Sequence, residues 1–263
     1  MPSLPTASVP PHSHALVLIH GAGGDSSVWA AQLEWFAARH RPALALDLPA
    51  HGETDGPPLP SIEAMADWVL REITARGLGK VVLGGHSMGS LVALHAAATQ
   101  PQRVAALVLV GTAFPMRVSP RLLAQAEADP LQAIDNVVRW SYAQPAPEHP
   151  PAGFQSPQHY RDLLVRQQAG WDAGSLLAAD LAACDRYAAG DASARNWAGP
   201  TLLLLGRNDR MTPPENAAAL RAALASVRTE LFDCGHNLMA EAPLAVAQAL
   251  GDWLEATVDP LPG

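Results

Sequence analysis

The sequence predicts an α/β protein with a mostly parallel sheet, helices on both faces of the sheet and an inserted helical segment. Apolar runs rich in Val, Leu and Ile alternate with stretches of helical apolar spacing. This alternation is typical of parallel strands joined by crossover helices. It is interrupted between residues 112 and 196, where only helical patterns occur. The motif Gly85-His86-Ser87-Met88-Gly89 lies where one apolar run passes into a helix, and such a turn exposes a serine at the edge of a sheet.

The first half of the chain supplies four predicted strands. Residues 1–13 are rich in Pro and Ser and predict a loose leader. Asp25 is placed to cap a first helix, a second helix begins at Ser61 and ends at Gly77, and a third follows the serine turn. The predicted strands are residues 15–19, 42–48, 81–84 and 104–110.

The second half contains the insertion and two further strands. Helical patterns cover residues 120–128, 131–142, 158–168 and 175–187. Strands are then predicted at residues 200–206 and 229–233, and a closing helix buries Val246, Leu250 and Trp253. Between those strands, Thr212-Pro213-Pro214-Glu215 has the pattern of a capping box that opens a helix. We therefore expect a core of residues 1–111 and 197–263, with residues 112–196 as a helical lid over the carboxyl ends of the strands, where ligands bind in open α/β sheets.

Composition limits the classes of function. The 263 residues are 49% hydrophobic and 16% charged, with a formal net charge of −8. The negative charge and the lack of a Lys/Arg run argue against nucleic-acid binding, so we expect a small-molecule ligand. Met1 to Pro11 lacks the pattern of a signal peptide, and no apolar run is long enough to span a membrane, so we expect a cytoplasmic protein. Cys184 and Cys234 are expected to be separate buried thiols. Oligomeric state is left open.

Three residues on successive loops predict nucleophilic catalysis. The hydroxyl of Ser87 is a weak nucleophile unless a base takes its proton and a third group orients that base. His236 follows the last predicted strand, at the same edge of the sheet as Ser87, and is the expected base. Asp209 follows the preceding strand and is the expected acid, with Asp233 as its nearest rival.

The turn after the first strand predicts an oxyanion hole. Acyl transfer develops a negative oxygen, and preorganised N–H groups must meet it. We expect the backbone N–H groups of Met88 and Ala22 to do so. The sequence Gly21-Ala22-Gly23-Gly24 lacks the G-x-G-x-x-G spacing of a dinucleotide site, so no cofactor is expected. No clustered Cys/His pattern predicts a metal site.

These motifs together resemble those of the α/β-hydrolase fold serine hydrolases with a cap domain. The resemblance rests on five stretches that span most of the chain, namely His20 to Gly24, Asp47 to Gly52, Gly85 to Gly89, Gly206 to Asp209, and Gly235-His236. It implies the same roles that the residues suggest: Ser87 as nucleophile, Asp209 as acid and His236 as base, with oxyanion donors at Ala22 and Met88.

The expected function is hydrolysis of a small to medium, largely apolar carboxylic ester through an acyl-enzyme intermediate. Carbon-carbon bond, lactone or thioester hydrolysis uses the same triad and remains an alternative, as does a ligand receptor that retains the triad. His86 is expected to be a hydrogen-bonded scaffold residue, with His20 and His51 bracing nearby loops. Candidates for an apolar substrate pocket are Trp29, Met116, Trp140 and Trp171.

Overall fold

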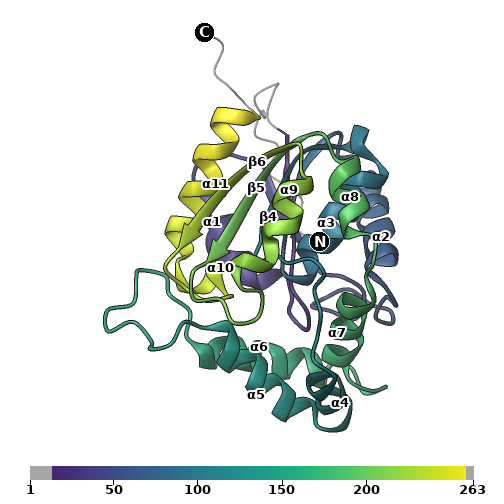
Figure 1. Ribbon diagram of the computed structural model, residues 1–263, viewed down its shortest axis with the longest axis vertical. Helices are drawn as coiled ribbons and strands as arrows, with labels where there is room; N and C mark the ends of the chain where they lie inside the picture. The colour runs from purple at the N-terminus through teal and green to yellow at the C-terminus, as the bar shows by residue number, and fades with distance from the viewer. Residues whose placement is uncertain (1–13, 259–263) are drawn as a thin grey trace.

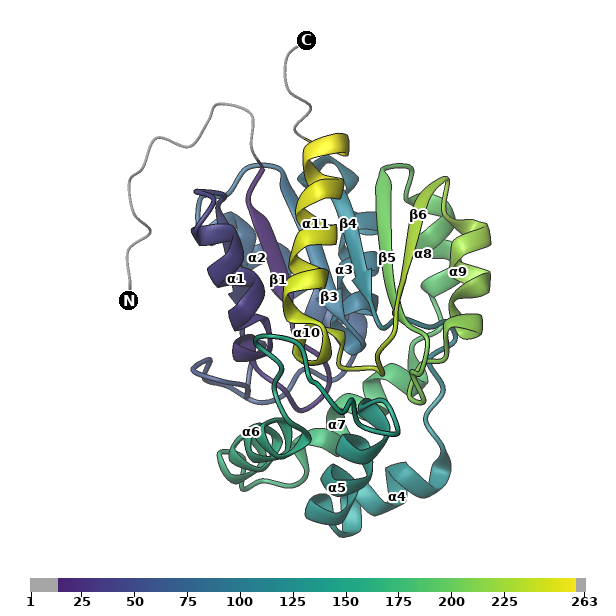
Figure 2. The same cartoon turned by 90° about the vertical axis from the view of Figure 1, so that its left-hand side faces the viewer.

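A six-stranded parallel sheet forms the centre of the computed structural model, which describes residues 14–258 (Figures 1 and 2). The strand order is β2-β1-β3-β4-β5-β6, and every neighbouring pair is parallel. The strands are β1 (Leu16–Ile19), β2 (Ala43–Leu46), β3 (Val81–His86), β4 (Val104–Val110), β5 (Pro200–Gly206) and β6 (Ser226–Phe232). The predicted fold class is confirmed, whereas the predicted leader at residues 1–13 lies outside the described residues.

Helices cover both faces of this sheet. One face carries α1 (Ala30–Ala37) and α11 (Pro243–Thr257), which pack against each other. The other carries α2 (Ile62–Ala75) and α3 (Met88–Thr99), with α9 (Ala218–Ala223) beside β5 and β6 (Figure 2). Short helical turns stand at Ser26–Trp29, Pro101–Arg103 and Pro214–Ala217, and α10 (Leu238–Glu241) precedes α11. Within the described residues, no helix is both long and apolar enough to cross a bilayer.

The alternation of side chains along each strand divides the core into two clusters. In β1, Val17 and Ile19 join the cluster under α2 and α3, whereas Leu16 and Leu18 join the cluster under α1 and α11. All four side chains are fully buried. Successive residues of a strand point to opposite faces, so a continuous apolar run is what a strand covered on both sides requires.

Residues 112–196 contain five helices between β4 and β5. Four of them, α4 (Pro120–Ala128), α5 (Pro130–Ser141), α6 (Pro157–Ala169) and α7 (Leu176–Arg186), gather beyond the ends of the strands (Figure 2). The fifth, α8 (Gly190–Asn196), packs instead against α3 and α9 on the face of the sheet. Within this segment, the helices therefore fall into two groups with different neighbours.

Two local predictions are wrong. Thr212 does not cap a helix, because the short helix at Pro214–Ala217 begins after Pro213 without a side-chain cap, and the Thr212 hydroxyl bonds to Asp209 instead. The last strand begins at Ser226, three residues before the expected start. Its first residues alternate between exposed and half-buried, because β6 is an edge strand. Its sequence therefore lacks the continuous apolar run that predicts the inner strands.

Candidate active site

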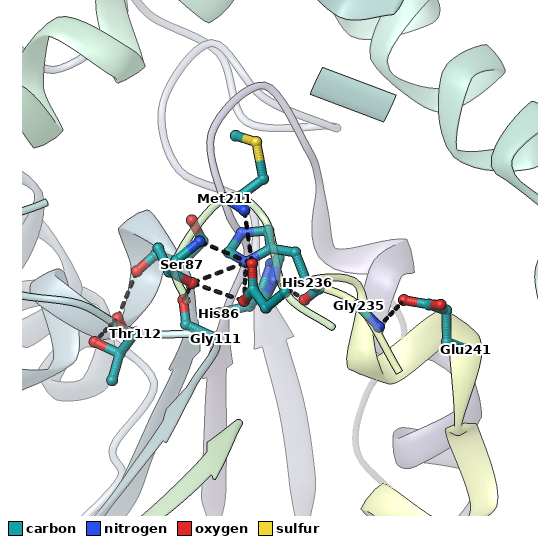
Figure 3. Close-up of polar contacts among 11 residues, drawn as sticks. His86, Ser87, Gly111, Thr112, Met211, Gly235, His236 and Glu241 are labelled. Carbon is teal, nitrogen blue, oxygen red and sulfur yellow. Dashed lines mark hydrogen bonds and ion pairs between the residues drawn. The ribbon is translucent and has the colours of Figure 1, made fainter. Parts of the chain in front are cut away.

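Ser87 lies at a sharp turn between β3 and α3. Its backbone has φ 50° and ψ −117°, which a non-glycine residue rarely adopts. The turn is closed by the flanking glycines: a Cβ at Gly85 would collide with the carbonyl of Gly89, and a Cβ at Gly89 would lie 2.5 Å from the His20 carbonyl oxygen. The serine is thus held in a strained conformation beyond the end of β3 (Figure 3).

His236 and Asp209 meet at the same edge of the sheet. The Nδ1 atom of His236 lies 2.8 Å from Oδ2 of Asp209, and both side chains are buried. The imidazole also stacks beside the ring of His86, the residue before Ser87, with 4.6 Å between ring centroids. Because Nδ1 is engaged by the carboxylate, Nε2 is the ring nitrogen left to exchange a proton with a nucleophile.

The Asp209 carboxylate is satisfied by four contacts. Its Oδ1 accepts hydrogen bonds from the backbone N–H groups of Met211 and Thr212, both at 2.8 Å. Its Oδ2 lies 2.8 Å from the Thr212 hydroxyl in addition to His236. Burial alone would raise the pKa of Asp209, but the charge and hydrogen bond of His236, with the backbone and side-chain hydrogen bonds of Thr212, lower it to about 2. The carboxylate is therefore ionised at any pH near neutrality.

Asp233, the rival acid, points elsewhere. It is exposed, and its Oδ1 accepts a hydrogen bond of 3.0 Å from the side-chain amide of Asn208. The geometry therefore pairs His236 with Asp209.

His86 has the position expected of a scaffold residue. Its Nε2 donates a 2.9 Å hydrogen bond to the backbone carbonyl of His236, which ties the serine turn to the histidine loop. Burial, and next the charge of His236, lower the pKa of His86 to about 3. His20 is similarly neutral: burial and the neighbouring His51 lower its pKa to about 4, and its Nε2 accepts the N–H of Leu48 at 3.1 Å.

The neutral histidines predict that stability falls on acidification. Between pH 6.5 and about 4, the unfolded chain binds a proton on each ring and the native protein does not. The free energy of unfolding therefore decreases as the pH falls through this window, by about 1.4 kcal/mol per ring and pH unit. Urea unfolding at pH 7 and pH 5 measures the decrease, and it should be smaller in His86→Gln, which keeps a donor but does not titrate there. An equal decrease in both proteins would contradict the prediction.

The two predicted oxyanion donors flank Ser87. Met88 is the first residue of α3, and the first N–H groups of a helix have no partner within it. Ala22 lies in the turn after β1 and lines the same cavity as Ser87. Among residues 14–258, no group of three or more His, Cys, Asp or Glu side chains is arranged to hold a metal ion.

Ser87 lines a cavity at this edge of the sheet. Met116 and Trp140, two of the predicted pocket residues, line it. Its remaining apolar wall is contributed by Val118, Leu122, Leu181 and Met211, with Cys184 alongside. Cys184 and Cys234 are both free and buried, as predicted, and burial raises the pKa of each thiol. Two arginines, Arg117 and Arg210, also line the cavity, and no Asp or Glu does among the described residues.

Trp29 and Trp171 lie away from this cavity, so the pocket prediction is wrong for them. Trp29 is fully buried in the core cluster beneath α1 and α11, because the turn that carries it packs on the face of the sheet rather than beyond its strands. Trp171 lines a separate hollow together with Arg166 and residues 52–56. A periodic apolar pattern marks a buried helix face but does not tell a core-facing residue from a pocket-facing one.

Glu241 is a site residue that the sequence reasoning missed. Its carboxylate is buried on α10, and Oε1 accepts the N–H of Gly235, beside His236, at 2.8 Å (Figure 3). Oε2 accepts the N–H of Ala143, just after α5, at 2.9 Å. Burial raises the pKa of Glu241, and the two backbone N–H groups oppose that rise. A charged residue inside the apolar stretch Leu238 to Ala242 was the available signal.

The chain is similar to several known proteins. Residues 14–243 match the family described as the alpha/beta hydrolase fold. The chain is 26% identical over 254 residues to (E)-2-((N-methylformamido)methylene)succinate hydrolase of Acinetobacter baylyi, covering 92% of this chain and 90% of that protein. It is 27% identical over 259 residues to 2-succinyl-6-hydroxy-2,4-cyclohexadiene-1-carboxylate synthase of an Enterobacter species, covering 94% of each. A solved esterase from Thermogutta terrifontis superposes with a TM-score of 0.81 at 24% identity, covering 94% of this chain and 91% of the esterase.

Proposed function

Because the chain belongs to the α/β-hydrolase fold family and is a hydrolase of that family, we propose that it cleaves a small to medium carboxylic ester through an acyl-enzyme on Ser87. The observation that carries the proposal is the 2.8 Å contact between His236 and the ionised Asp209, close to a strained serine that lines a cavity. These groups can perform nucleophilic acyl transfer without a further reactant except water.

The proposed reaction has two halves. Ser87 Oγ attacks the ester carbonyl while His236 Nε2 takes its proton, and the imidazolium is stabilised by Asp209. The carbon-oxygen bond to the alcohol then breaks, and His236 returns the proton to the leaving alkoxide. Water then loses a proton to the same nitrogen and attacks the acyl carbon, the bond from that carbon to Ser87 Oγ breaks, and His236 returns the proton to Oγ as the carboxylic acid leaves.

The oxyanion of each tetrahedral intermediate is proposed to bind the N–H groups of Ala22 and Met88. A donor of this kind typically contributes about 3 kcal/mol to lowering the barrier. Helices α4 to α7 are proposed to form the lid over these groups, because Met116, Leu122, Trp140 and Leu181 from this part of the chain line the cavity. The predicted boundary at residue 196 would then include α8, which contacts the core, so we propose that the lid ends after α7.

The cavity lining suggests a substrate with an apolar body and a negative group. Arg117 is held by a 2.9 Å hydrogen bond from Nη1 to the backbone carbonyl of Asp185, and Arg210 follows the proposed acid directly. With no carboxylate in the described lining, their guanidinium groups are suited to a carboxylate of the substrate. The names of both curated relatives also describe carboxylate-bearing compounds, a succinate and a cyclohexadiene-carboxylate.

Two esters of equal length test this assignment. We expect the half-ester mono-4-nitrophenyl adipate to be cleaved with a higher kcat/KM than 4-nitrophenyl hexanoate, by about 10-fold, since one hydrogen bond to a charged group contributes roughly 1.5–3 kcal/mol. Arg210→Gln should remove this preference and leave hexanoate cleavage unchanged. Arg207→Gln, an exposed arginine outside the cavity lining, is the matched control. Equal rates on both esters would contradict the anionic preference, and no cleavage of either would contradict the esterase proposal.

Other reactions on the same triad remain distinct candidates. Carbon-carbon, lactone and thioester hydrolysis differ from ester hydrolysis in the leaving group, which the described residues do not select. A receptor that retains the triad would react once with a fluorophosphonate probe, which labels the serine, but would not cleave either ester at a sustained rate. Sustained turnover of either nitrophenyl ester without a partner protein therefore distinguishes the enzyme from the receptor.

A further inference from the structure

A buried aspartate on α7 reaches the turn proposed to form the oxyanion hole. Asp180 is fully buried, and its Oδ2 accepts the backbone N–H of Gly23 at 2.8 Å. The same oxygen lies 2.9 Å from Nε2 of His51, which follows β2 and is itself 1% exposed. One carboxylate oxygen therefore joins α7 to two loops at the carboxyl edge of the sheet. A buried carboxylate is costly unless a charge or hydrogen bonds compensate it.

The ring of His51 supplies that compensating charge. Its Nδ1 lies 3.0 Å from the carbonyl oxygen of Pro49, so both ring nitrogens face oxygen atoms that can only accept. Two acceptors require two N–H donors, and the ring that has both is the imidazolium. Burial lowers the pKa of His51, but the charge and hydrogen bond of Asp180 outweigh burial and raise it. The neighbouring ring of His20, 4.7 Å away between centroids, stays neutral, so the pair carries one positive charge.

The turn that Asp180 holds is also restrained at Gly21, whose carbonyl shares a peptide group with the Ala22 N–H and lies 2.9 Å from Nδ1 of His20. Gly23 has φ +68°, a conformation that favours glycine, and Gly24 donates a 3.1 Å hydrogen bond back to Gly21. Ala22, between these glycines, lines the cavity with Ser87. Side chains of Leu164 and Leu177, from α6 and α7, pack at the α-carbon of Gly23. The direction of the Ala22 N–H therefore depends on the contacts of the Gly21 carbonyl together with the anchoring of the next peptide group by Asp180.

We propose that Asp180 is a positioning residue for the reaction: by holding the Gly23 N–H, it helps to orient the Ala22 N–H toward the oxyanion. Catalysis then depends on the position of α7 relative to this turn. This inference rests on the proposed oxyanion role of Ala22. Asp180 acts through the backbone and touches no reacting atom. Helix α7 contributes Leu181 and Cys184 to the cavity wall, and through Asp180 the same helix holds the turn that contains Ala22.

The test is Asp180→Asn, measured per active site. The amide has no charge to keep His51 doubly protonated, so the shared oxygen loses one of its two donors and the turn is held less firmly. We expect kcat per fluorophosphonate-titrated site to fall by 10- to 100-fold, the range for a misplaced catalytic group, with KM within about twofold. The affinity for a trifluoromethyl ketone, whose serine adduct carries an oxyanion, should fall by the same factor as kcat.

The control separates positioning from general destabilisation. Val138→Ala truncates a buried side chain of α5 that does not line the cavity, and it should lower stability while leaving kcat per site and ketone affinity unchanged. Unchanged kcat per site in Asp180→Asn, or a reduced kcat with unchanged ketone affinity, would overturn the inference. Wild-type protein that cleaves no ester would instead overturn the proposed function, and the role of the turn with it.

A second measurement concerns the ring of His51. In nitrogen-15 spectra of histidine-labelled wild-type protein recorded at decreasing pH, the His51 imidazole, assigned by its absence in His51→Gln, should gain its second nitrogen proton at a higher pH than a free histidine does. This variant leaves the carboxylate on the Gly23 N–H and should lose less kcat per site than Asp180→Asn. If Asp180→Asn fails to fold, Asp180→Glu, which keeps the charge but moves the carboxylate, takes its place, and unchanged kcat per site and ketone affinity in that variant overturn the inference.

Discussion

Ser87→Ala is expected to lose about 10⁶-fold in kcat for 4-nitrophenyl esters, the loss typical when a triad nucleophile is removed. The change deletes one oxygen at a turn whose φ is positive and whose fold depends on the two flanking glycines, so the variant should keep its structure. The proposed oxyanion donors and the cavity remain in this variant to bind substrate, so KM should change much less than kcat.

Covalent labelling provides the direct readout for this variant. A fluorophosphonate should add one mass increment to the wild type at Ser87 and none to Ser87→Ala. Ser156→Ala is a matched control, since it removes the serine that caps α6 and should cost about 1 kcal/mol of stability without affecting labelling. Residual activity within 100-fold of the wild type, or labelling at another residue, would show that Ser87 is not the nucleophile.

Asp209→Asn is expected to reduce kcat by about 10⁴-fold with little change in the fold. The reason lies in the local hydrogen bonds. The N–H groups of Met211 and Thr212 both donate to Oδ1, so the amide oxygen must occupy that position. The amide NH₂ is then forced toward Nδ1 of His236, which must become an acceptor, and Nε2 carries the proton toward Ser87. The base is present in the wrong tautomer.

The neighbouring acid provides the comparison for this second variant. Asp233→Asn changes the same type of side chain on the adjacent loop, where it is exposed and accepts a hydrogen bond from Asn208, and should leave kcat within twofold. In the wild type, the pKa of Asp209 near 2 means that its protonation contributes nothing to any loss of activity above about pH 4. If Asp233→Asn were the more damaging change, the assignment of the acid would be wrong.

The sheet and the proposed triad could be predicted because their signals are local. A strand buried on both faces is a continuous apolar run, and β4 and β5 have the predicted bounds. In parallel strands all carboxyl ends meet at one edge, so residues following β3, β5 and β6 must converge. Helix α8 was missed because Gly190 to Asn196 is small and polar and has no apolar period.

The residues that brace the site could not be predicted, because their partners are distant in sequence. Asp180 lies 157 residues from Gly23, and Glu241 lies 98 residues from Ala143. Nothing near Thr212 indicates that its hydroxyl will turn back to Asp209 rather than cap the next helix. Such contacts are decided by how the loops pack together, which a single sequence does not encode as a pattern.

The buried carboxylates of Glu241 and Asp180 place different constraints on the sequence of the segment between β4 and β5. Glu241 belongs to the part of the chain after β6. Its contact with the segment is the backbone N–H at position 143, which any residue except proline can supply. Asp180 is a side chain of the segment itself, and a replacement segment must bring its own carboxylate to the same place. Exchange of α4 and α5 between relatives is therefore the more permissive route to a new substrate. Exchange of α7 carries the aspartate requirement with it, and exchange of α6 would remove Gln167, whose side chain bonds to Gly52 and Asp25.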